Sequence, residues 1–181
     1  ILYVGRIEPL KGIDILLNAI GYMENKHDVS IIVVGGVSDS DPELNRLQSM
    51  IVELGIEDKV TFTGVLEHAA LPDYYRAADV FVLPSHYESF GLVALEAMAS
   101  GVPVISTNTG GIKEVNIDNK TGYLANVGDI DFMSSKAIYL FSNNKILDKF
   151  KENAFEHSRK FDLPNILPLY EELYHKLVMN K

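Results

Sequence analysis

Two glutamates eight positions apart, Glu88 and Glu96, are the most unusual charged residues of this chain. Glu96 lies in the run at residues 92–99, whose other members are apolar or small, and a helix that is apolar all round is typically buried. A carboxylate on a buried helix is costly unless something hydrogen-bonds it. No other residue between 80 and 112 is charged at pH 7. We therefore expect the partners of these carboxylates to come from elsewhere in the fold, or from a ligand rich in hydroxyl groups.

A second group of charged residues lies in the first loop, which follows the apolar run at residues 1–4. This loop holds two cations, Arg6 and Lys11, and it leads into an expected helix. Helix N-termini attract anions, and Arg and Lys side chains strengthen such a site for a diphosphate. The alternative is that both cations are solvated at the surface, with Lys11 paired to Glu8.

Three further loops offer groups that a ligand could contact. Gly64 would let a ligand approach the backbone, although an ordinary turn glycine explains this position at least as well. Gly110 and Gly111 indicate either free backbone N–H groups or a simple turn. His86 is a candidate base or ligand. However, no second His, Asp or Cys stands at metal or triad spacing, which favours a solvent-facing histidine.

Several common site motifs are missing from the sequence. The glycines do not form G-x-G-x-x-G, and no G-x-x-x-x-G-K-[ST] is present, which argues against a dehydrogenase and a P-loop ATPase. Asp39 and Asp41 have the spacing of a metal–nucleotide clamp. Because they precede Pro42 and Glu43, capping of a helix explains them better. We therefore expect no metal and no cofactor.

The composition is that of a single globular domain. The chain has 181 residues, 47% of them hydrophobic, and no run reaches the roughly 18 apolar residues of a membrane span. A net charge of −9 argues against a nucleic-acid-binding protein, which usually carries a basic patch. The lack of cysteine excludes disulfides and agrees with a cytoplasmic location. Because the sequence starts inside an apolar run, we interpret it as a fragment that lacks an N-terminal part.

Short apolar runs alternate with segments of helical periodicity along the chain. Most of the runs are apolar throughout, which is typical of parallel strands buried on both faces. The alternation predicts an α/β fold with a doubly wound, mostly parallel Rossmann-like sheet and helices on both faces, as one domain over residues 1–181. We expect strands at residues 1–4, 29–34, 59–63, 80–83, 102–106 and 122–124, and helices at residues 13–23, 43–54, 69–78, 92–99, 131–141, 145–157 and 165–179.

This sheet would bring the candidate loops together. In open α/β sheets, ligands bind beyond the carboxyl ends of the strands. The loops that hold Lys11, Gly64, Glu88 and Gly110 each follow a strand candidate. We therefore expect the unusual residues to share one crevice at that end of the sheet.

Taken in order, these motifs resemble a known family. An E-x7-E spacing alone is a weak motif. It becomes specific together with the R-x4-K of the first loop, the Gly-Val-Pro of residues 101–103 and the Gly-Gly of residues 110–111. In this order the chain, over nearly all its length, resembles the C-terminal, donor-binding domain of retaining glycosyltransferases with the GT-B fold, in the large family 4 (group 1).

The resemblance implies roles for individual residues. Arg6 and Lys11, with Gly5 beside them, would hold the donor diphosphate and stabilise the departing nucleotide. Glu88 would bond sugar hydroxyls and act with the two cations in catalysis, and Glu96 would accept from ribose hydroxyls. The base would stack near Gly64 and Val65. Backbone N–H groups around the start of the following helix would meet the sugar and the β-phosphate, namely those of Phe90, Gly91, Leu92 and Val93.

The resemblance also implies a reaction and its partners. A hexosyl-type unit would pass from a nucleotide sugar, with UDP favoured, to an unidentified acceptor by a same-face substitution that retains configuration. Glu88 and Glu96 would not be the acid and nucleophile of a glycosidase. The acceptor domain would lie in the absent N-terminal part, and the final helix, at about residues 165–179, would dock on it. Any membrane association would belong to that part too.

Other functions stay open on the sequence. A nucleotide-sugar epimerase or a phosphorylase would use the same fold, the first without an acceptor sugar and the second with a cofactor lysine that we cannot identify. A non-catalytic α/β binding module is the third alternative, and Arg6, Lys11, Glu88 and Glu96 argue against it. The isolated fragment is expected to be inactive in transfer and to act as a binding domain.

Overall fold

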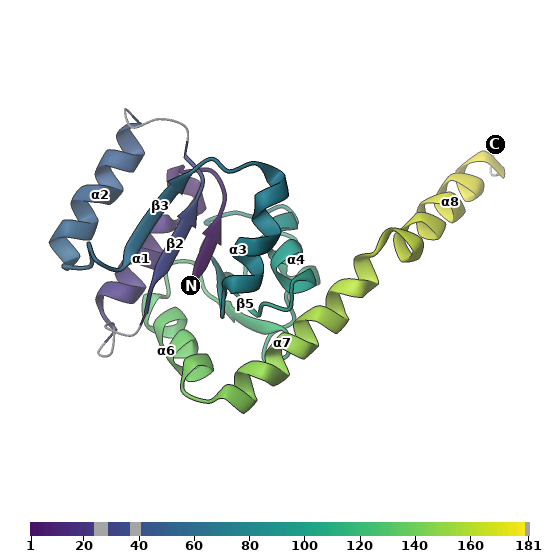
Figure 1. Cartoon of the computed structure of the whole chain (residues 1–181). Helices are drawn as coiled ribbons and strands as arrows, with labels where there is room; N and C mark the ends of the chain where they lie inside the picture. The colour runs from purple at the N-terminus through teal and green to yellow at the C-terminus, as the bar shows by residue number, and fades with distance from the viewer. Residues whose placement is uncertain (24–28, 37–40, 180–181) are drawn as a thin grey trace.

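A six-stranded parallel sheet forms the centre of the molecule (Figure 1). The computed structural model describes residues 1–23, 29–36 and 41–179. Within the sheet the strand order is β3-β2-β1-β4-β5-β6, so the chain winds outwards in one direction and then in the other. The strands are β1 (Leu2–Val4), β2 (Ile31–Val34), β3 (Val60–Gly64), β4 (Phe81–Leu83), β5 (Val104–Thr107) and β6 (Gly122–Ala125). The predicted doubly wound parallel sheet is thereby confirmed.

Helices cover both faces of this sheet. Strand β1 shows why, because Tyr3 belongs to one buried apolar cluster while Leu2 and Val4 belong to another. Helices α1, α2 and α6 contribute to the first cluster, and α3 and α4 contribute to the second. The helices are α1 (Ile13–Gly21), α2 (Pro42–Leu54), α3 (Leu71–Ala77), α4 (Leu92–Ala99), α5 (Ile112–Val115), α6 (Ile130–Phe141), α7 (Asn144–Ser158) and α8 (Leu163–Met179).

Helix α4 differs from the sequence-based expectation. Its apolar composition predicted a helix buried all round. In the structure only Ala94, Ala97 and Met98 are buried, while Leu92 is 65% exposed. The helix packs one face on the sheet and on its neighbouring helices, so composition alone overstated its burial. Glu96 consequently sits at a half-buried position and does not lie in an apolar interior.

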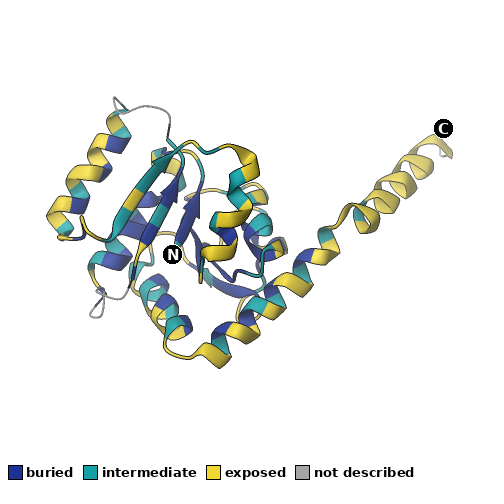
Figure 2. Cartoon of the chain, viewed as in Figure 1, coloured by how far each residue is buried: buried dark blue, intermediate teal, exposed yellow. Residues whose placement is uncertain are grey.

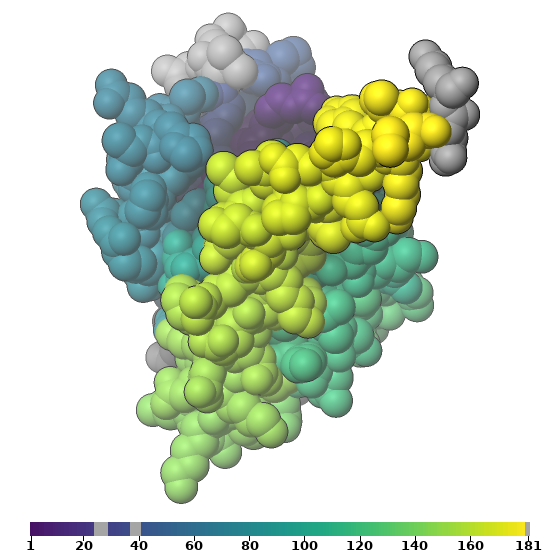
Figure 3. All heavy atoms as spheres, turned by 90° about the vertical axis from the view of Figure 1, so that its right-hand side faces the viewer, coloured from purple at the N-terminus to yellow at the C-terminus, as the bar shows by residue number. Residues whose placement is uncertain are grey.

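Helix α8 stands away from the body of the protein. It contains no buried residue, and Figures 1 and 2 show it as an exposed extension that follows α7. In the space-filling view of Figure 3 the same helix lies towards the viewer. No helix in the described part of the chain is both long and apolar enough to cross a membrane. Large apolar side chains remain exposed along α8, namely those of Leu163, Leu167, Leu169, Tyr170, Leu173, Tyr174, Leu177, Val178 and Met179.

Candidate functional site

An ion pair between Lys11 and Glu88 lies at the centre of the candidate site. Lys11 ends the short 3-10 helix η1 (Pro9–Lys11), and its Nζ donates to Oε2 of Glu88 at 2.9 Å. Both side chains are mostly buried, with 20% and 12% exposed. The alternative pairing of Lys11 with Glu8 is wrong, because Glu8 instead accepts from Arg6 at 2.7 Å. The partner of the Glu88 carboxylate therefore comes from another part of the fold, as one of the two sequence-based hypotheses required.

The backbones of the first loop (residues 5–12) and of the Glu88 loop (residues 84–91) are joined directly. The N–H of His86 donates to the carbonyl of Leu10 at 2.9 Å. Gly12 makes this approach possible. Its φ is +66°, and a Cβ there would lie 2.2 Å from the carbonyl oxygen of Pro84. Only glycine fits such a position without a shift of the backbone. This contact helps to bring Lys11 within reach of Glu88, 77 residues later in the chain.

The Glu88 loop is also held from the opposite side, by the loop after β5. The N–H of Gly111 donates to the carbonyl of Glu88 at 3.0 Å. Gly110 has a φ of +59°, and a Cβ there would lie 1.9 Å from that same carbonyl oxygen. The N–H of Gly111 is therefore not free for a ligand, and the double glycine serves close packing of two loops. The side chain of Thr109 adds a bond to the carbonyl of His86 at 3.2 Å, while the His86 side chain is exposed.

A cavity of about 270 Å³ opens beside the Lys11–Glu88 pair. It lies beyond Val4 and Leu83, at the carboxyl ends of β1 and β4. The strand order reverses between these two strands, and ligands of doubly wound folds bind at such a switch point. Most of the donor-site residues predicted from the sequence line this cavity, namely Gly5, Arg6, Lys11, Glu88, Phe90, Gly91, Leu92 and Val93.

The first turn of α4 faces this cavity with unused donors. Gly91 is the N-cap with a φ of +90°, and no side chain caps the helix. The N–H of Ala94 is the first to bond within the turn, to the carbonyl of Gly91 at 3.0 Å. In the described part of the chain, the N–H groups of Leu92 and Val93 meet no acceptor. Such groups carry the positive end of the helix dipole and suit an anionic ligand.

Arg6 lies at the rim of the cavity. Its side chain is 74% exposed, and its guanidinium contacts Glu8. Because an exposed ion pair is worth little, this contact holds Arg6 only weakly and leaves the guanidinium able to turn towards a diphosphate. Arg6 and Lys11 thus differ in kind, since Lys11 is mostly enclosed and points at a carboxylate while Arg6 is at the surface.

Glu96 has a protein partner that the sequence analysis missed. The phenol of Tyr75, on α3, donates to Oε2 of Glu96 at 2.8 Å. Tyr75 is buried, and this burial, followed by the bond to Glu96, raises the pKa of its phenol. Glu96 does not line the cavity, but it lies one helical turn beyond Leu92 and Val93 on the same face of α4. This carboxylate therefore has a partner within the protein, and its expected ribose partner stays a prediction.

Gly64 and Val65 lie apart from the other predicted residues. Gly64 ends β3 with a φ of +72°, and a Cβ there would meet open space. Val65 is 72% exposed. Neither residue lines the cavity, although β3 ends at the same edge of the sheet as β1. The role of these two residues beside a base stays a prediction.

Phe161 is a second residue that the sequence analysis did not assign to the site. It ends the 3-10 helix η4 (Arg159–Phe161), and its ring packs edge-on against the ring of Phe90 with the centroids 5.9 Å apart. Phe90 lines the cavity, so this contact supports one wall of the site from the far end of the chain. Sequence spacing carries no signal for such a contact between residues that are far apart in the chain.

Of the two aspartates with the spacing of a metal–nucleotide clamp, the structure describes Asp41, which caps a helix. Asp41 accepts from the N–H of Glu43 at 2.9 Å and caps α2, as predicted. Asp39 lies outside the described residues. Within the part of the chain that the structure describes, no three His, Asp or Glu residues are grouped closely enough to hold a metal ion.

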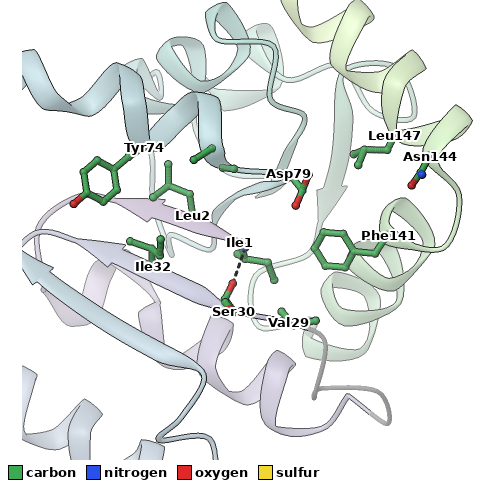
Figure 4. Close-up of a pocket in the computed structure, with 12 residues that line it drawn as sticks. Ile1, Leu2, Val29, Ser30, Ile32, Tyr74, Asp79, Phe141, Asn144 and Leu147 are labelled. Carbon is green, nitrogen blue, oxygen red and sulfur yellow. Dashed lines mark hydrogen bonds between the residues drawn. The ribbon is translucent and has the colours of Figure 1, made fainter.

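A larger cavity, of about 490 Å³, lies at the opposite, amino-terminal ends of the strands (Figure 4). The backbone nitrogen of Ile1 lies there and donates to the carbonyl of Ser30 at 2.7 Å. Asp79 also lines the cavity and pairs with Lys151 at 3.2 Å. Among the described residues, no side-chain cation lines this cavity, whereas two line the smaller cavity, which therefore fits an anionic ligand better.

A family model and the similar sequences of known proteins both indicate the same family. The model of the family described as "Glycosyl transferases group 1" matches residues 1–157. A D-inositol 3-phosphate glycosyltransferase from Catenulispora acidiphila is 40% identical over 168 residues, which are 89% of this chain and 39% of that protein. A protein of the same name from Corynebacterium glutamicum is 31% identical over 99% of this chain and 44% of its own length. The chain therefore spans less than half the length of these curated relatives.

Solved structures agree with the sequence relatives. Sucrose-phosphate synthase from Thermosynechococcus elongatus superposes with a TM-score of 0.89 at 32% identity, over 99% of this chain and 45% of that one. HepE from Anabaena, solved in complex with UDP, superposes with a TM-score of 0.88 at 26% identity, over 97% of this chain and 48% of that one. The C-terminal domain of a group 1 family protein from Francisella tularensis superposes with a TM-score of 0.80 at 29% identity.

Proposed function

This chain belongs to the group 1 glycosyl transferases, and we propose that it is the donor-binding part of a retaining GT-B glycosyltransferase. In this proposal the enzyme transfers a hexosyl unit from a UDP-sugar to an acceptor. The observation that carries it is the cavity at the switch point of the sheet, where Lys11, Glu88 and the start of α4 meet. Lys11 and the free N–H groups suit a diphosphate, and the Glu88 carboxylate suits the hydroxyls of a sugar.

Lys11, Arg6 and the first turn of α4 would bind the diphosphate. Lys11 is enclosed and fixed by Glu88, while Arg6 is at the rim and can turn inwards. The leaving nucleotide gains negative charge as the bond to the sugar breaks. Lys11 and the N–H groups, which are already in place, would stabilise this charge in the transition state without reorganisation, and Arg6 would add to this once it has turned inwards. No metal and no cofactor belong to this proposal.

Glu88 would bind hydroxyl groups of the sugar. A carboxylate accepts from hydroxyls with short, charge-assisted bonds. Lys11 contacts only one oxygen of Glu88 in the structure, so the other oxygen has capacity for a sugar hydroxyl. Glu88 is not proposed as a nucleophile. A retaining glycosidase uses two carboxyl groups that flank the same sugar, whereas here Glu88 lines the cavity and Glu96 does not.

UDP is the proposed nucleotide because HepE, a structural relative, was solved with UDP and with UDP-glucose. The base would lie over Gly64 and Val65, because Gly64 has no side chain and the space beside it is open. Glu96 would accept from the ribose. The cytoplasmic location expected from the sequence stays a prediction.

Helix α8 is proposed to dock on the acceptor-binding part of a longer protein. The relatives are more than twice as long as this chain, and α8 exposes apolar residues over its whole length. Leu169, Leu173 and Leu177 follow each other at four-residue spacing, so they form one apolar stripe on the helix. Covering that stripe would remove an apolar surface that a lone domain leaves in water.

Calorimetric titration of the chain tests the donor-binding proposal. UDP, UDP-glucose, UDP-N-acetylglucosamine and GDP-mannose would each be added in turn. We expect one site per chain, with UDP compounds bound more tightly than the GDP compound. A folded chain that binds none of the four at millimolar concentration contradicts the proposal. Preference for GDP-mannose would contradict the choice of UDP and leave the diphosphate site intact.

A further inference from the structure

Tyr75 and Glu96 form a contact that the proposed reaction does not account for. The two residues come from neighbouring helices, α3 and α4, and the phenol donates to Oε2 of the carboxylate at 2.8 Å. Glu96 is on a helix without a basic residue, and in the described part of the chain no ion pair reaches it. The partner of this carboxylate is therefore the neutral hydroxyl of Tyr75, in a charge-assisted hydrogen bond. This is unlike Glu88, whose carboxylate is paired with the ammonium group of Lys11.

The core fixes the phenol of Tyr75 in place. Tyr75 is only 2% exposed, and its ring packs against the ring of Phe81 with the centroids 5.9 Å apart and the planes at 55°. Phe81 is the first residue of β4 and is fully buried. Because the ring is held by the sheet, the hydroxyl points to one place. The bond to this fixed hydroxyl holds the long, half-buried side chain of Glu96 in one orientation.

The place of Glu96 on α4 shows what this orientation achieves. Leu92 and Val93 line the cavity, and Glu96 follows them by four and three residues. Residues at these spacings share a face of a helix, so Glu96 lies one turn further along the cavity side of α4. The Oε2 atom of Glu96 accepts from Tyr75. The other carboxylate oxygen, Oε1, is not among the buried side-chain atoms that lack a hydrogen-bond partner. That oxygen is the one within reach of a ligand that extends past the first turn.

We propose that Tyr75 is a positioning residue that orients Glu96 to select ribose over deoxyribose in the bound nucleotide. This inference rests on the proposed function, because it assumes that a nucleoside diphosphate occupies the cavity. Tyr75 itself touches no ligand. It directs the carboxylate so that a ribose hydroxyl, when present, meets an acceptor already in place. A nucleotide without that hydroxyl leaves the acceptor unpaired and loses affinity.

Two nucleotides that differ only in the ribose hydroxyls test this role. The dissociation constants of UDP and 2′,3′-dideoxy-UDP would be measured by calorimetry for the native chain and its variants. We expect the native chain to favour UDP by about tenfold or more, the scale of a lost bond to a charged group. Tyr75→Phe keeps the packed ring and removes only the hydroxyl. It should shrink that preference at least threefold, in the same direction as Glu96→Gln.

Two controls separate positioning from general damage. Tyr74→Phe removes a phenol one position away that makes no hydrogen bond to Glu96 in the structure, and it should leave the preference unchanged. The double variant Tyr75→Phe with Glu96→Gln should lose no more preference than Glu96→Gln alone, because Tyr75 acts only through Glu96. A ratio of two dissociation constants is insensitive to the fraction of folded protein, so a loss of stability in Tyr75→Phe would not imitate the expected result.

The outcomes distinguish this inference from the proposed function. If the native chain prefers UDP and Tyr75→Phe retains the full preference, the role of Tyr75 is wrong while the donor site stands. If the double variant loses clearly more preference than Glu96→Gln alone, Tyr75 acts by another route and the inference is again wrong. If the native chain does not bind UDP, both the inference and the proposed function are contradicted.

Discussion

The ammonium group of Lys11 and the carboxylate of Glu88 bond at 2.9 Å, although 77 residues separate them in the sequence. Each charge therefore satisfies the other in a place that is mostly closed to water. A carboxylate next to a proposed diphosphate site would otherwise repel the ligand. Lys11 offsets this repulsion and can still donate to a phosphate with its remaining hydrogens. The pair thus lets a carboxylate and a diphosphate lie side by side.

Removal of the Lys11 charge should weaken binding of the nucleotide itself. Lys11→Met keeps most of the apolar stem and leaves the negative charge of Glu88 beside the phosphates. We expect the dissociation constant of UDP to rise about 10- to 100-fold, as for a lost charge-assisted bond. Calorimetric titration measures it. Lys113→Met, at an exposed position on α5, is the matched control and should bind UDP as the native chain does.

Glu88→Gln should act on the sugar and not on the nucleotide. The variant keeps the shape of the side chain and removes the charge that sugar hydroxyls donate to. We expect the affinity for UDP to stay within about threefold, while the gain in affinity from the glucose of UDP-glucose falls about tenfold. Competition titration of UDP-glucose against UDP measures this difference. Glu53→Gln, exposed on α2, serves as the control, and an equal loss of affinity for both ligands would refute the assignment.

Gly110→Ala should damage the Glu88 loop. The added Cβ would lie 1.9 Å from the carbonyl oxygen of Glu88, at a φ of +59°. We expect the free energy of unfolding to fall by about 3 kcal/mol or more, because the clash adds to the strain of the left-handed backbone. Gly128→Ala is the matched control, since its φ is +80° but a Cβ would meet open space. That variant should cost only about 1–2 kcal/mol. Equal losses in urea denaturation would contradict the close packing.

Stability should depend on the protonation of His157. Burial, followed by the nearby positive charge of Lys160, lowers the pKa of this imidazole from its ordinary value of 6.5. Unfolding returns the pKa to that value, so near pH 6 the unfolded chain binds the proton more readily than the folded one. The free energy of unfolding should therefore fall as the pH drops from about 7.5 through 6.5 and below.

His157→Gln removes this titration and should flatten that part of the pH profile. Urea denaturation at about pH 7.5 and pH 5.5 measures both slopes. At about pH 7.5 the imidazole is mostly neutral in the folded and the unfolded chain. Any difference in the free energy of unfolding between the native chain and His157→Gln should there reflect packing and not titration. An identical fall in stability for the native chain and the variant would show that other groups cause the pH dependence.

The sequence predicted the fold well because its signals are local. Residues 80–83, for example, are apolar throughout, and so short an apolar run is typical of a strand buried on both faces. Asp41 and Gly55 mark the start and stop of α2 through the needs of their own backbone, and both appear as predicted. The four-residue helix α5 was missed because it is too short to show a helical period.

The site was predicted in part, for a physical reason. Motif order placed Lys11, Glu88 and the start of α4 together, and the structure brings them to one cavity. The acid that pairs with Lys11 depends on a contact between loops that spacing does not encode, so Glu8 was the only partner that the sequence suggested for Lys11. The Tyr75–Glu96 bond was missed for the same reason. Apolar composition also could not tell which face of α4 would be covered.

A crystal structure of the chain soaked with UDP-glucose tests the central claim most directly. We predict that the diphosphate lies between Lys11, Arg6 and the first turn of α4, with the glucose beside Glu88. Density for the nucleotide in the larger cavity near Ile1 and Asp79, or with its sugar away from Glu88, would contradict the account.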